Sequence, residues 1–401
     1  MNHVVVITRW RERYAEYERY LDHRDCAVTY ISTETGTVPA TAADTWMVRA
    51  TDDPVEVGEG VRALAARHGA PTAIIALKED DLLVASALRA EWECPGPTTA
   101  DLLPFRDKYL MSRTIAAAGL PVEPFALAPD EDAIRAFAAQ HGWPVVVKPR
   151  LSSSSEGVAR LGDHSQLGDR RPGMLVQKYN RNPVYHVDGL FDGGLACWRA
   201  ARYMNSCLDF RMGSVLGSVE EDDPGLNAVI GEHAERFMAA LAAEQPTVFH
   251  LEMFVDRQTG QCVFLEAGAR AGGGETPFLW REVHGYDLVE QVCRIQRGER
   301  PTPVPALGRE IAGHLLIPAP APRPCRIVEI TPLVGSEPGP YAEALPRPGD
   351  VLPAADSYYE HVGGRFRFRG PSTAAVEEAI LASAASFRVS AEPVEAVEVS
   401  R

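Results

Sequence analysis

The sequence has no long hydrophobic run. Among its 401 residues, no apolar stretch approaches the roughly 20 residues that a membrane-spanning helix needs. The first residues, Met-Asn-His-Val-Val-Val-Ile-Thr, also lack the cationic segment and long apolar segment of a secretory leader. Val4 to Ile7 predict a first strand instead. We therefore expect a cytoplasmic protein with no membrane partner.

Cysteine is scarce and shows no metal-binding or disulfide pattern. The seven cysteines are an odd number, are widely scattered, and include no Cys-x-x-Cys pair. This pattern argues against a disulfide framework and against a structural zinc site. We expect the cysteines to be packing residues.

Positive charge is also in short supply. The chain has 40 Lys and Arg residues against 55 Asp and Glu residues, which gives a formal net charge of -15. A broad nucleic-acid surface requires clustered Lys and Arg, so we expect no nucleic-acid partner. An anionic ligand would instead need a local cationic pocket.

The first hundred residues lack the glycine fingerprint of a dinucleotide-binding fold. Short apolar runs at Val4 to Ile7, Val28 to Ile31 and Ala73 to Leu77 alternate with helical patterns, one of them carrying Tyr14, Tyr17 and Leu21. This alternation predicts a βαβ domain. Because Ile7 is followed by Thr-Arg-Trp-Arg-Glu-Arg-Tyr and not by Gly-x-Gly-x-x-Gly, a Rossmann cofactor is not expected.

A lysine stands at the end of a buried strand pattern and is followed by a run of serines. Val145 to Val147 are β-branched and predict a strand covered on both faces, which would fix the position of Lys148. The segment Ser152 to Gly157 then offers hydroxyl and backbone N–H groups with little side-chain bulk. Such a segment can surround phosphate oxygens. The alternative is an ordinary serine-rich surface turn.

Two glutamates lie on a predicted hairpin between Val248 and Glu266. A three-residue loop Gln258-Thr259-Gly260, with glycine in the left-handed position, would place Glu252 directly opposite Glu266. Facing carboxylates repel each other and favour a cation between them, and Mg²⁺ accepts such ligands. The alternative is that one glutamate is a solvated strand residue.

Glu266 continues into a glycine-rich stretch, Ala-Gly-Ala-Arg270-Ala-Gly-Gly-Gly-Glu275. Glycines allow the backbone to approach a ligand closely, and the planar guanidinium of Arg270 suits a phosphate or carboxylate group. Because two strand carboxylates lie next to it, this stretch indicates a ligand-binding site and not only a connecting loop.

Five residues, in this order and on these predicted elements, resemble the ATP-grasp superfamily: Lys108, Lys148, Glu252, Glu266 and Arg270. The best match within it is the carboxylate-amine ligase branch that includes the L-amino acid ligases. The matching segments are Phe-Arg-Asp-Lys108, Val-Val-Lys148-Pro, Val176-Gln-Lys-Tyr179, His-Leu-Glu252 and Leu-Glu266-Ala-Gly-Ala-Arg270. Each segment alone is a weak signal, but the ordered set is specific and covers nearly the whole chain.

The resemblance implies an ATP-dependent ligase that forms a C–N bond in two steps. The γ-phosphoryl group of ATP would pass to a substrate carboxylate, and an amine would then displace phosphate from the acyl phosphate to give an amide, ADP and phosphate. Implied cofactors are ATP and Mg²⁺, and implied partners are a small carboxylate and a small amine, one of them an amino acid. The sequence leaves the oligomeric state open, a homodimer included.

The resemblance also assigns roles to residues of this chain. Arg270 would be catalytic, and Glu252 and Glu266 would bind the metal. ATP would be bound by Lys108, Lys148, Ser153, Ser154, Gln177, Lys178, Tyr179 and Asp188. Substrate would be bound by Arg202, Gly272 and Gly273, with Tyr203 also facing it. Alternatives remain a turn aspartate at 188, a surface arginine at 202 and a core tyrosine at 203.

Two positions depart from the superfamily pattern. Gly268 stands where many members have asparagine two residues after the second glutamate, which leaves open whether one or two Mg²⁺ ions bind. Gln177 stands where the adenine-binding hinge often begins with glutamate. The alternatives to the ligase are a biotin-type ATP-grasp carboxylase and a nucleotide-binding regulator without chemistry.

The expected fold class is a multidomain α/β and α+β protein with the ATP-grasp fold. We expect an N-terminal βαβ domain at 1–100, a first ATP-grasp subdomain with the phosphate lid at 101–174, a second with the metal site at 175–305, and a small C-terminal α+β domain at 306–401.

Overall fold

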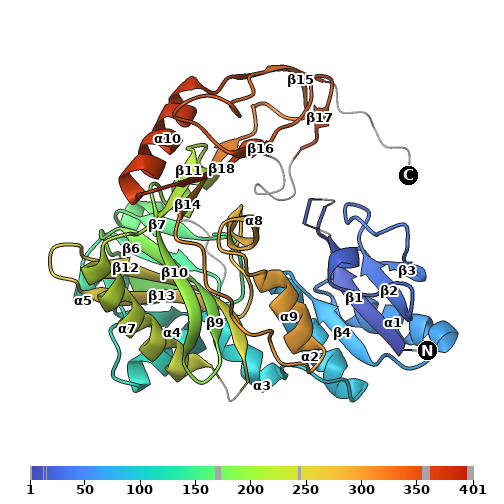
Figure 1. Ribbon diagram of the computed structural model, residues 1–401. Helices are drawn as coiled ribbons and strands as arrows, with labels where there is room; N and C mark the ends of the chain where they lie inside the picture. The colour runs from blue at the N-terminus through green and yellow to red at the C-terminus, as the bar shows by residue number, and fades with distance from the viewer. Residues whose placement is uncertain are drawn as a thin grey trace.

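The computed structural model describes residues 2–11, 13–14, 16–167, 173–242, 245–354 and 362–394. Within these ranges, no helix has the length and apolar character needed to cross a bilayer. The strands form four sheets, three of four or fewer strands and one of eight. Figure 1 shows the N-terminal sheet beside the larger central body, with the C-terminal helix and strands above both.

The N-terminal domain is built on a parallel sheet of order β3-β2-β1-β4. Its elements are β1 (Asn2–Thr8), the 3-10 helix η1 (Tyr17–Arg19), β2 (Cys26–Ser32), β3 (Asp44–Met47), α1 (Pro54–His68), β4 (Ala73–Ala76), the 3-10 helix η2 (Glu79–Asp81) and α2 (Leu82–Glu91). Val5 and Ile7 pack with α1 and α2, whereas Val4 and Val6 pack on the other face with Tyr17 and a later helix. The prediction of one helix carrying Tyr14, Tyr17 and Leu21 is wrong: among the described residues of this segment only η1 is helical, and Tyr14 lies in a turn.

The strand order of this domain reverses at β1. The chain adds β2 and β3 on one side of β1 and then returns to place β4 on the other side. Open α/β sheets bind ligands in the crevice that such a reversal leaves at the carboxyl ends of the strands. The residues after β1 and β4 are therefore placed to contribute to a site.

A short helical connection leads into an antiparallel sheet of order β5-β8-β6-β7. The elements are α3 (Thr99–Leu102), η3 (Leu103–Phe105), α4 (Lys108–Ala117), β5 (Phe125–Ala128), α5 (Glu131–His141), β6 (Val145–Lys148), β7 (Ala159–Leu161), η4 (His164–Gln166) and β8 (Met174–Lys178). Helix α5 packs on this sheet through Ile134 and Phe137. Because β8 pairs with β5 and β6, this sheet extends to Lys178, past the predicted boundary at 174.

The eight-stranded sheet has the order β13-β12-β9-β10-β11-β14-β18-β16. Its first part comprises β9 (Val184–Phe191), β10 (Leu195–Tyr203), α6 (Cys207–Arg211), β11 (Leu216–Glu220), α7 (Pro224–Leu241), β12 (Thr247–Val255), β13 (Cys262–Gly268), α8 (Thr276–Glu282) and α9 (Leu288–Gln296). Helices α4 and α7 pack together on this sheet around Phe237 and Phe264. Helices α8 and α9 are separated at Gly285, which has φ of +72°.

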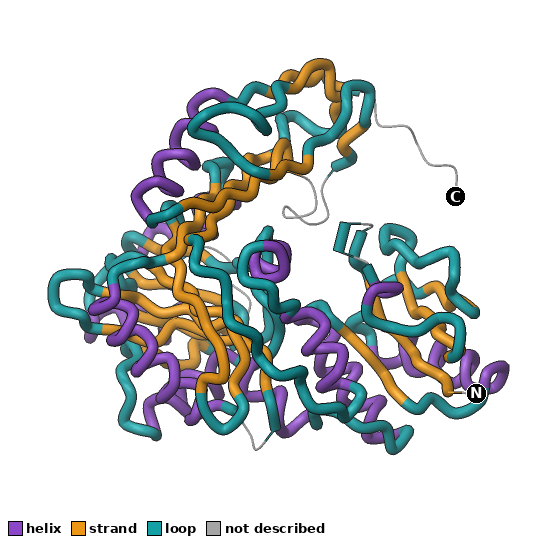
Figure 2. The backbone as a smooth tube through the Cα atoms, viewed as in Figure 1, coloured by secondary structure: helices purple, strands orange, loops and turns teal. Residues whose placement is uncertain are grey.

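The C-terminal region shares the large sheet. It comprises β14 (Ile311–Pro318), β15 (Cys325–Ile330), β16 (Ala342–Ala344), β17 (Val351–Leu352), β18 (Val362–Gly370), α10 (Thr373–Ser386) and β19 (Val389–Pro393). Strand β14 pairs with β11, so the strands pass from one predicted domain into the next, and Figure 2 shows this continuity. Helix α10 packs on β14 and β18, and β17-β15-β19 form a small separate sheet. The eight-stranded sheet thus continues across the predicted domain boundary at 305.

Candidate active site

One cavity lies where the N-terminal domain, the serine segment and the eight-stranded sheet meet. The N-terminal domain contributes Trp10, Arg11, Tyr14, Leu77, Lys78 and Glu79, and the serine segment contributes Ser153, Ser154 and Ser155. The remaining wall includes Tyr203, His250, Glu252, Glu266, His314 and the segment from Arg270 to Gly274. Seven of the fourteen predicted site residues therefore line one cavity: Ser153, Ser154, Glu252, Glu266, Arg270, Gly272 and Gly273.

Glu252 and Glu266 lie directly opposite each other on β12 and β13, as the sequence predicted. The predicted loop was wrong, however, because Asp256 and Gln261 close a four-residue loop through the bond from Asp256 N to Gln261 O of 2.9 Å. The register shifts between Glu252 and Met253, and this irregularity restores the pairing of the two glutamates. Gly260 has φ of +73°, as expected for its turn position.

Two lysines lie next to this carboxylate pair. Lys108 begins α4 after the N-cap Asp107, and its Nζ donates to the Ser152 carbonyl at 2.7 Å and lies 3.7 Å from Glu266 Oε2. Lys148 ends β6 and is buried. Burial lowers the pKa of Lys148 to about 8, although Glu266 and Glu252 favour its charged form. Two cations and two carboxylates thus share one small region.

The segment Ser152–Gly157, called the serine loop below, curves over the cavity. Ser153 Oγ donates to Asp80 Oδ2 at 2.9 Å, and Arg211 Nη1 donates to the Ser154 carbonyl at 3.1 Å. Ser154 and Ser155 have φ of +54° and +55°. Non-glycine residues adopt this left-handed conformation at a cost, and it is found most often where a site requires it.

Two buried polar atoms near the lysines lack a hydrogen-bond partner among the described residues, Ser152 Oγ and Gln177 Nε2. Buried donors without a partner are rare in native structures, so these two atoms are candidates for bonding a ligand. Gln177 lies on β8 opposite Val146, two residues before Lys148. Lys178 is exposed, and Tyr179 lies under the guanidinium of Arg160 at 4.9 Å. These hinge residues do not line the cavity itself.

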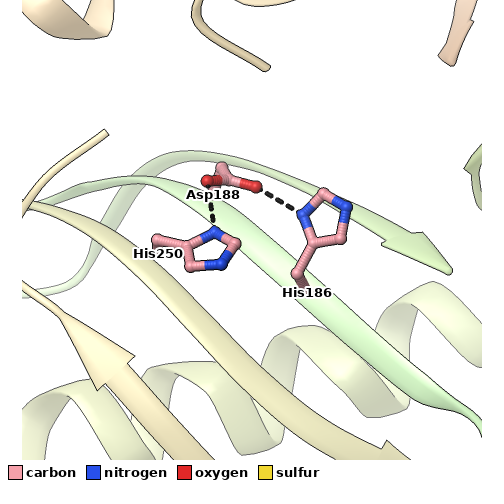
Figure 3. A group of neighbouring side chains, drawn as sticks. All are labelled: His186, Asp188 and His250. Carbon is pink, nitrogen blue, oxygen red and sulfur yellow. Dashed lines mark hydrogen bonds and ion pairs between the residues drawn. The ribbon is translucent and has the colours of Figure 1, made fainter. Parts of the chain in front are cut away.

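Asp188 lies between two histidines beside the carboxylate pair (Figure 3). Its two oxygens contact His186 Nδ1 at 2.6 Å and His250 Nδ1 at 2.9 Å. His250 Nε2 lies 3.4 Å from Glu252 Oε1. Burial acts to lower the pKa of His250, but Asp188 and Glu252 outweigh it and raise the pKa to about 9. His250 therefore links Asp188 to Glu252, and Asp188 itself does not belong to the cavity lining.

The same histidine affects Glu252. Burial acts to raise the pKa of Glu252, but the hydrogen bond and charge of His250 hold it below its ordinary value. His186, His250 and Asp188 lie close enough for their ligand atoms to share a metal ion. Because both imidazoles are already bonded to the carboxylate, we interpret the group as a hydrogen-bonded network that supports Glu252.

The segment Gly268–Gly274, called the glycine loop below, passes between Asp188 and the cavity. A Cβ on Gly272 would lie 2.3 Å from Asp188 Oδ1, so only glycine fits there. Gly274 has φ of +61°, and its carbonyl accepts a bond from the Tyr14 hydroxyl at 3.2 Å. Arg270 points into the cavity and is held by Glu79, whose Oε2 accepts from Nε at 2.6 Å.

Arg202 is not brought to the cavity. Its Nη2 contacts both carboxylate oxygens of Glu377 on α10 at 3.0 Å. Tyr203, the next residue on β10, lines the cavity instead. Side chains alternate along a strand, so neighbours on β10 cannot both face the same side. Tyr203 therefore faces the cavity, whereas Arg202 connects β10 to α10.

Sequence reasoning missed several residues that the structure places at the site. His250 shares the strand face of Glu252 because it lies two positions earlier, a spacing that could have revealed it. Glu79 and Asp80 follow β4, at the carboxyl end of a parallel strand where ligands bind. His314, on β14, lines the cavity, and burial lowers its pKa to about 3.

The carboxylate pair fits Mg²⁺ by its chemistry. Two facing carboxylates supply the hard oxygen ligands that this ion prefers, and water or phosphate oxygens complete its shell. The side chain of Glu266 is 37% exposed and that of Glu252 is 14% exposed, so both can reach an ion in the cavity. Gly268, two residues after Glu266, offers no side-chain ligand.

The fold is an ATP-grasp fold. The L-amino acid ligase from Bacillus licheniformis superimposes with a TM-score of 0.74 at 18% identity, covering 97% of this chain and 98% of that one. Biotin carboxylase from Campylobacter jejuni superimposes with a TM-score of 0.66 at 15% identity, covering 97% and 92%. The expectation of this fold is therefore confirmed.

Curated sequence relatives include an amino acid ligase and a dapdiamide synthase. The L-arginine-specific L-amino acid ligase of Bacillus subtilis is 24% identical over 217 residues, 50% of this chain and 52% of that protein. Dapdiamide A synthase of Enterobacter agglomerans is 24% identical over 208 residues, 47% and 48% of the two chains. The chain thus spans about half the length of these relatives. No protein-family model matches the sequence.

Proposed function

We propose that this protein is an ATP-dependent carboxylate-amine ligase that joins an amino acid to a second substrate through an acyl phosphate. The observation that carries the proposal is the pairing of Glu252 with Glu266 beside Lys108, Lys148 and Arg270. Phosphoryl transfer depends on positioning and charge neutralisation and needs no nucleophilic side chain. The ligase relatives support the same reaction class.

In the first step, an oxygen of the substrate carboxylate attacks the γ-phosphorus of ATP. The bond between that phosphorus and the β,γ-bridging oxygen breaks, which releases ADP and leaves an acyl phosphate. The ammonium groups of Lys108 and Lys148 would contact phosphate oxygens, and the Arg270 guanidinium would contact the transferring group. Gln177 Nε2, buried without a partner among the described residues, would donate to the adenine edge.

In the second step, a neutral amine attacks the acyl carbon. The C–O bond to phosphate breaks, the nitrogen loses its proton, and an amide and inorganic phosphate result. Arg270 would stabilise the oxyanion that forms, and the backbone of Gly272 and Gly273 would hold the substrate carboxylate. The serine loop would exclude water that would otherwise hydrolyse the acyl phosphate.

Glu252 and Glu266 would hold Mg²⁺, which supplies charge neutralisation for the phosphate oxygens when bound. His250 supports this arrangement because it keeps Glu252 ionised and oriented. Asp188 in turn fixes His250 by its 2.9 Å contact.

The decisive experiment is a phosphate-release screen with MgATP and amino acids, supplied singly and in pairs. The proposal expects release only when a carboxylate and an amine are both present, with a new amide detected by mass spectrometry. Release that requires bicarbonate and biotin would indicate the carboxylase alternative. Nucleotide binding without any release would indicate the regulator.

A further inference from the structure

Two adjacent acidic residues of the N-terminal domain connect both loops of the cavity. Glu79 and Asp80 form the start of η2, directly after β4. Neither belongs to the residue set that the sequence assigned to ATP, metal or substrate. Their carboxylates are largely buried, with side-chain exposures of 12% and 19%.

Glu79 is fixed between two guanidinium groups. Its Oε1 accepts from Arg106 Nη1 at 2.6 Å, and its Oε2 accepts from Arg270 Nε at 2.6 Å. Burial acts to raise the pKa of Glu79, but Arg270 and Arg106 outweigh it and lower the pKa to about 2. The carboxylate is therefore charged, and each of its oxygens has a set direction.

Arg270 is oriented by the same contact. Its Nε donates to Glu79, and its Nη1 donates to the Ala271 carbonyl at 2.9 Å. Within the described part of the chain, Nη2 makes no hydrogen bond, so this nitrogen is left to meet a ligand in the cavity. A planar guanidinium held at two nitrogens can present the third in one direction.

Asp80 makes the corresponding contact with the serine loop. Its Oδ2 accepts from Ser153 Oγ at 2.9 Å and from Arg9 Nη2 at 3.1 Å. Its Oδ1 accepts from Arg106 Nη2 at 3.1 Å. Arg106 thus bridges the two carboxylates, and the pair joins the serine loop to Arg270.

We propose that Glu79 is a positioning residue for Arg270, and that Asp80 is the contact by which the closed serine loop is aligned with it. The inference rests on the proposed function, because it assumes that Arg270 meets a transferring phosphoryl group. Contacts from Glu79 and Asp80 would make the N-terminal domain part of the phosphoryl-transfer machinery, because they act through Arg270 and Ser153.

The test uses the full-length protein and the binding of MgADP with aluminium fluoride, a mimic of the transferring phosphoryl group. Glu79→Gln should weaken binding of this complex at least tenfold while leaving the affinity for MgADP alone unchanged. In an Arg270→Met background, Glu79→Gln should cause no further loss. Glu91→Gln, which replaces an exposed glutamate of the same domain that bonds Arg62 away from this cavity and the adjoining one, should change neither affinity.

A role for Glu79 in domain stability alone would give a different result. Glu79→Gln would then weaken MgADP and the fluoride complex equally, or would cost as much in the Arg270→Met background as in the wild type, and the inference would fail. If wild-type protein does not bind MgADP at all, the proposed function fails first.

Asp80 has its own readout. With MgADP and aluminium fluoride bound, Asp80→Asn should increase hydrogen exchange at residues 152–157 at least tenfold, and Glu79→Gln should change it less. Unchanged exchange in Asp80→Asn would show that Asp80 does not align the serine loop.

Discussion

The serine loop and the glycine loop both present small residues to one cavity, but the structure holds them in different ways. The glycine loop continues from β13 and is followed by Glu275, which is fully buried. Glu275 contacts Arg13 from the N-terminal domain, and it lies 3.7 Å from Arg365 and 3.5 Å from Arg367 on β18. Three arginines from two other parts of the chain thus fix this end of the loop.

The serine loop is contacted through two backbone carbonyls and a hydroxyl instead of a buried carboxylate. Its contacts beyond its own residues include Lys108 with Ser152, Asp80 with Ser153 and Arg211 with Ser154. Ser154 is exposed and has a left-handed backbone. Small residues therefore serve two purposes here. In the glycine loop they allow close packing, and in the serine loop we predict that they allow movement.

The largest expected effect concerns the metal site next to the glycine loop. Glu266→Gln removes one charge of the pair that leads into the glycine loop, so turnover should fall at least about a hundredfold because metal binding contributes several kcal/mol. The protein should stay folded, since the Glu266 side chain is 37% exposed. Steady-state kinetics and a melting curve check both points. If this variant turns over at the wild-type rate, Glu266 is not a metal ligand.

Close packing of the glycine loop predicts a difference between neighbouring glycines. In Gly272→Ala the new Cβ would lie 2.3 Å from Asp188 Oδ1, and overpacking should cost about 1–3 kcal/mol of unfolding free energy. Gly273→Ala is the matched control, because no atom lies within 4 Å of its Cβ. Urea denaturation of both variants measures the difference. Equal losses would mean that the loop is not packed against Asp188.

Lys148 ends the strand that precedes the serine loop. Its proposed contact with ATP predicts that ATP affinity depends on pH. Lys148→Met should raise the ATP dissociation constant at least tenfold, a loss of about 1.4 kcal/mol. Because the pKa of Lys148 is about 8, its ammonium is present below that pH and is lost above it. ATP affinity of the wild type should therefore weaken as the pH rises from 7 to 9. Calorimetry should find this dependence reduced in Lys148→Met, and identical pH profiles would contradict the assignment.

The sequence predicted the site best where the signal was local. The strand ending at Lys148 and the glutamates of one hairpin each depend on neighbours within about twenty residues, and their placement was confirmed. Even there, the glutamates face each other through a register shift that the loop prediction did not include.

Contacts between distant segments could not be predicted. Glu79 meets Arg270 across 191 positions of the chain, and Tyr14 meets the Gly274 carbonyl across 260. No periodicity reports such pairs, because each depends on how complete domains pack. Arg202 shows the same limit, since only the position of α10 reveals its partner Glu377.

The smallest expected change in free energy is in the local opening of the serine loop. Its measurement compares the two loops directly. Without nucleotide, the serine loop should open readily, because no apolar side chain anchors residues 152–157 and local opening is easiest where few buried contacts exist. MgATP would add acceptors for the loop's hydroxyl and N–H groups. Hydrogen exchange at 152–157 should therefore slow about tenfold with MgATP, which corresponds to about 1.4 kcal/mol. Exchange at 268–274 should be slow in both states, because Glu275 and Tyr14 hold the glycine loop without nucleotide. If the serine loop is already as protected as the glycine loop before nucleotide is added, it is a fixed turn, and closure over an acyl phosphate must be assigned to another segment.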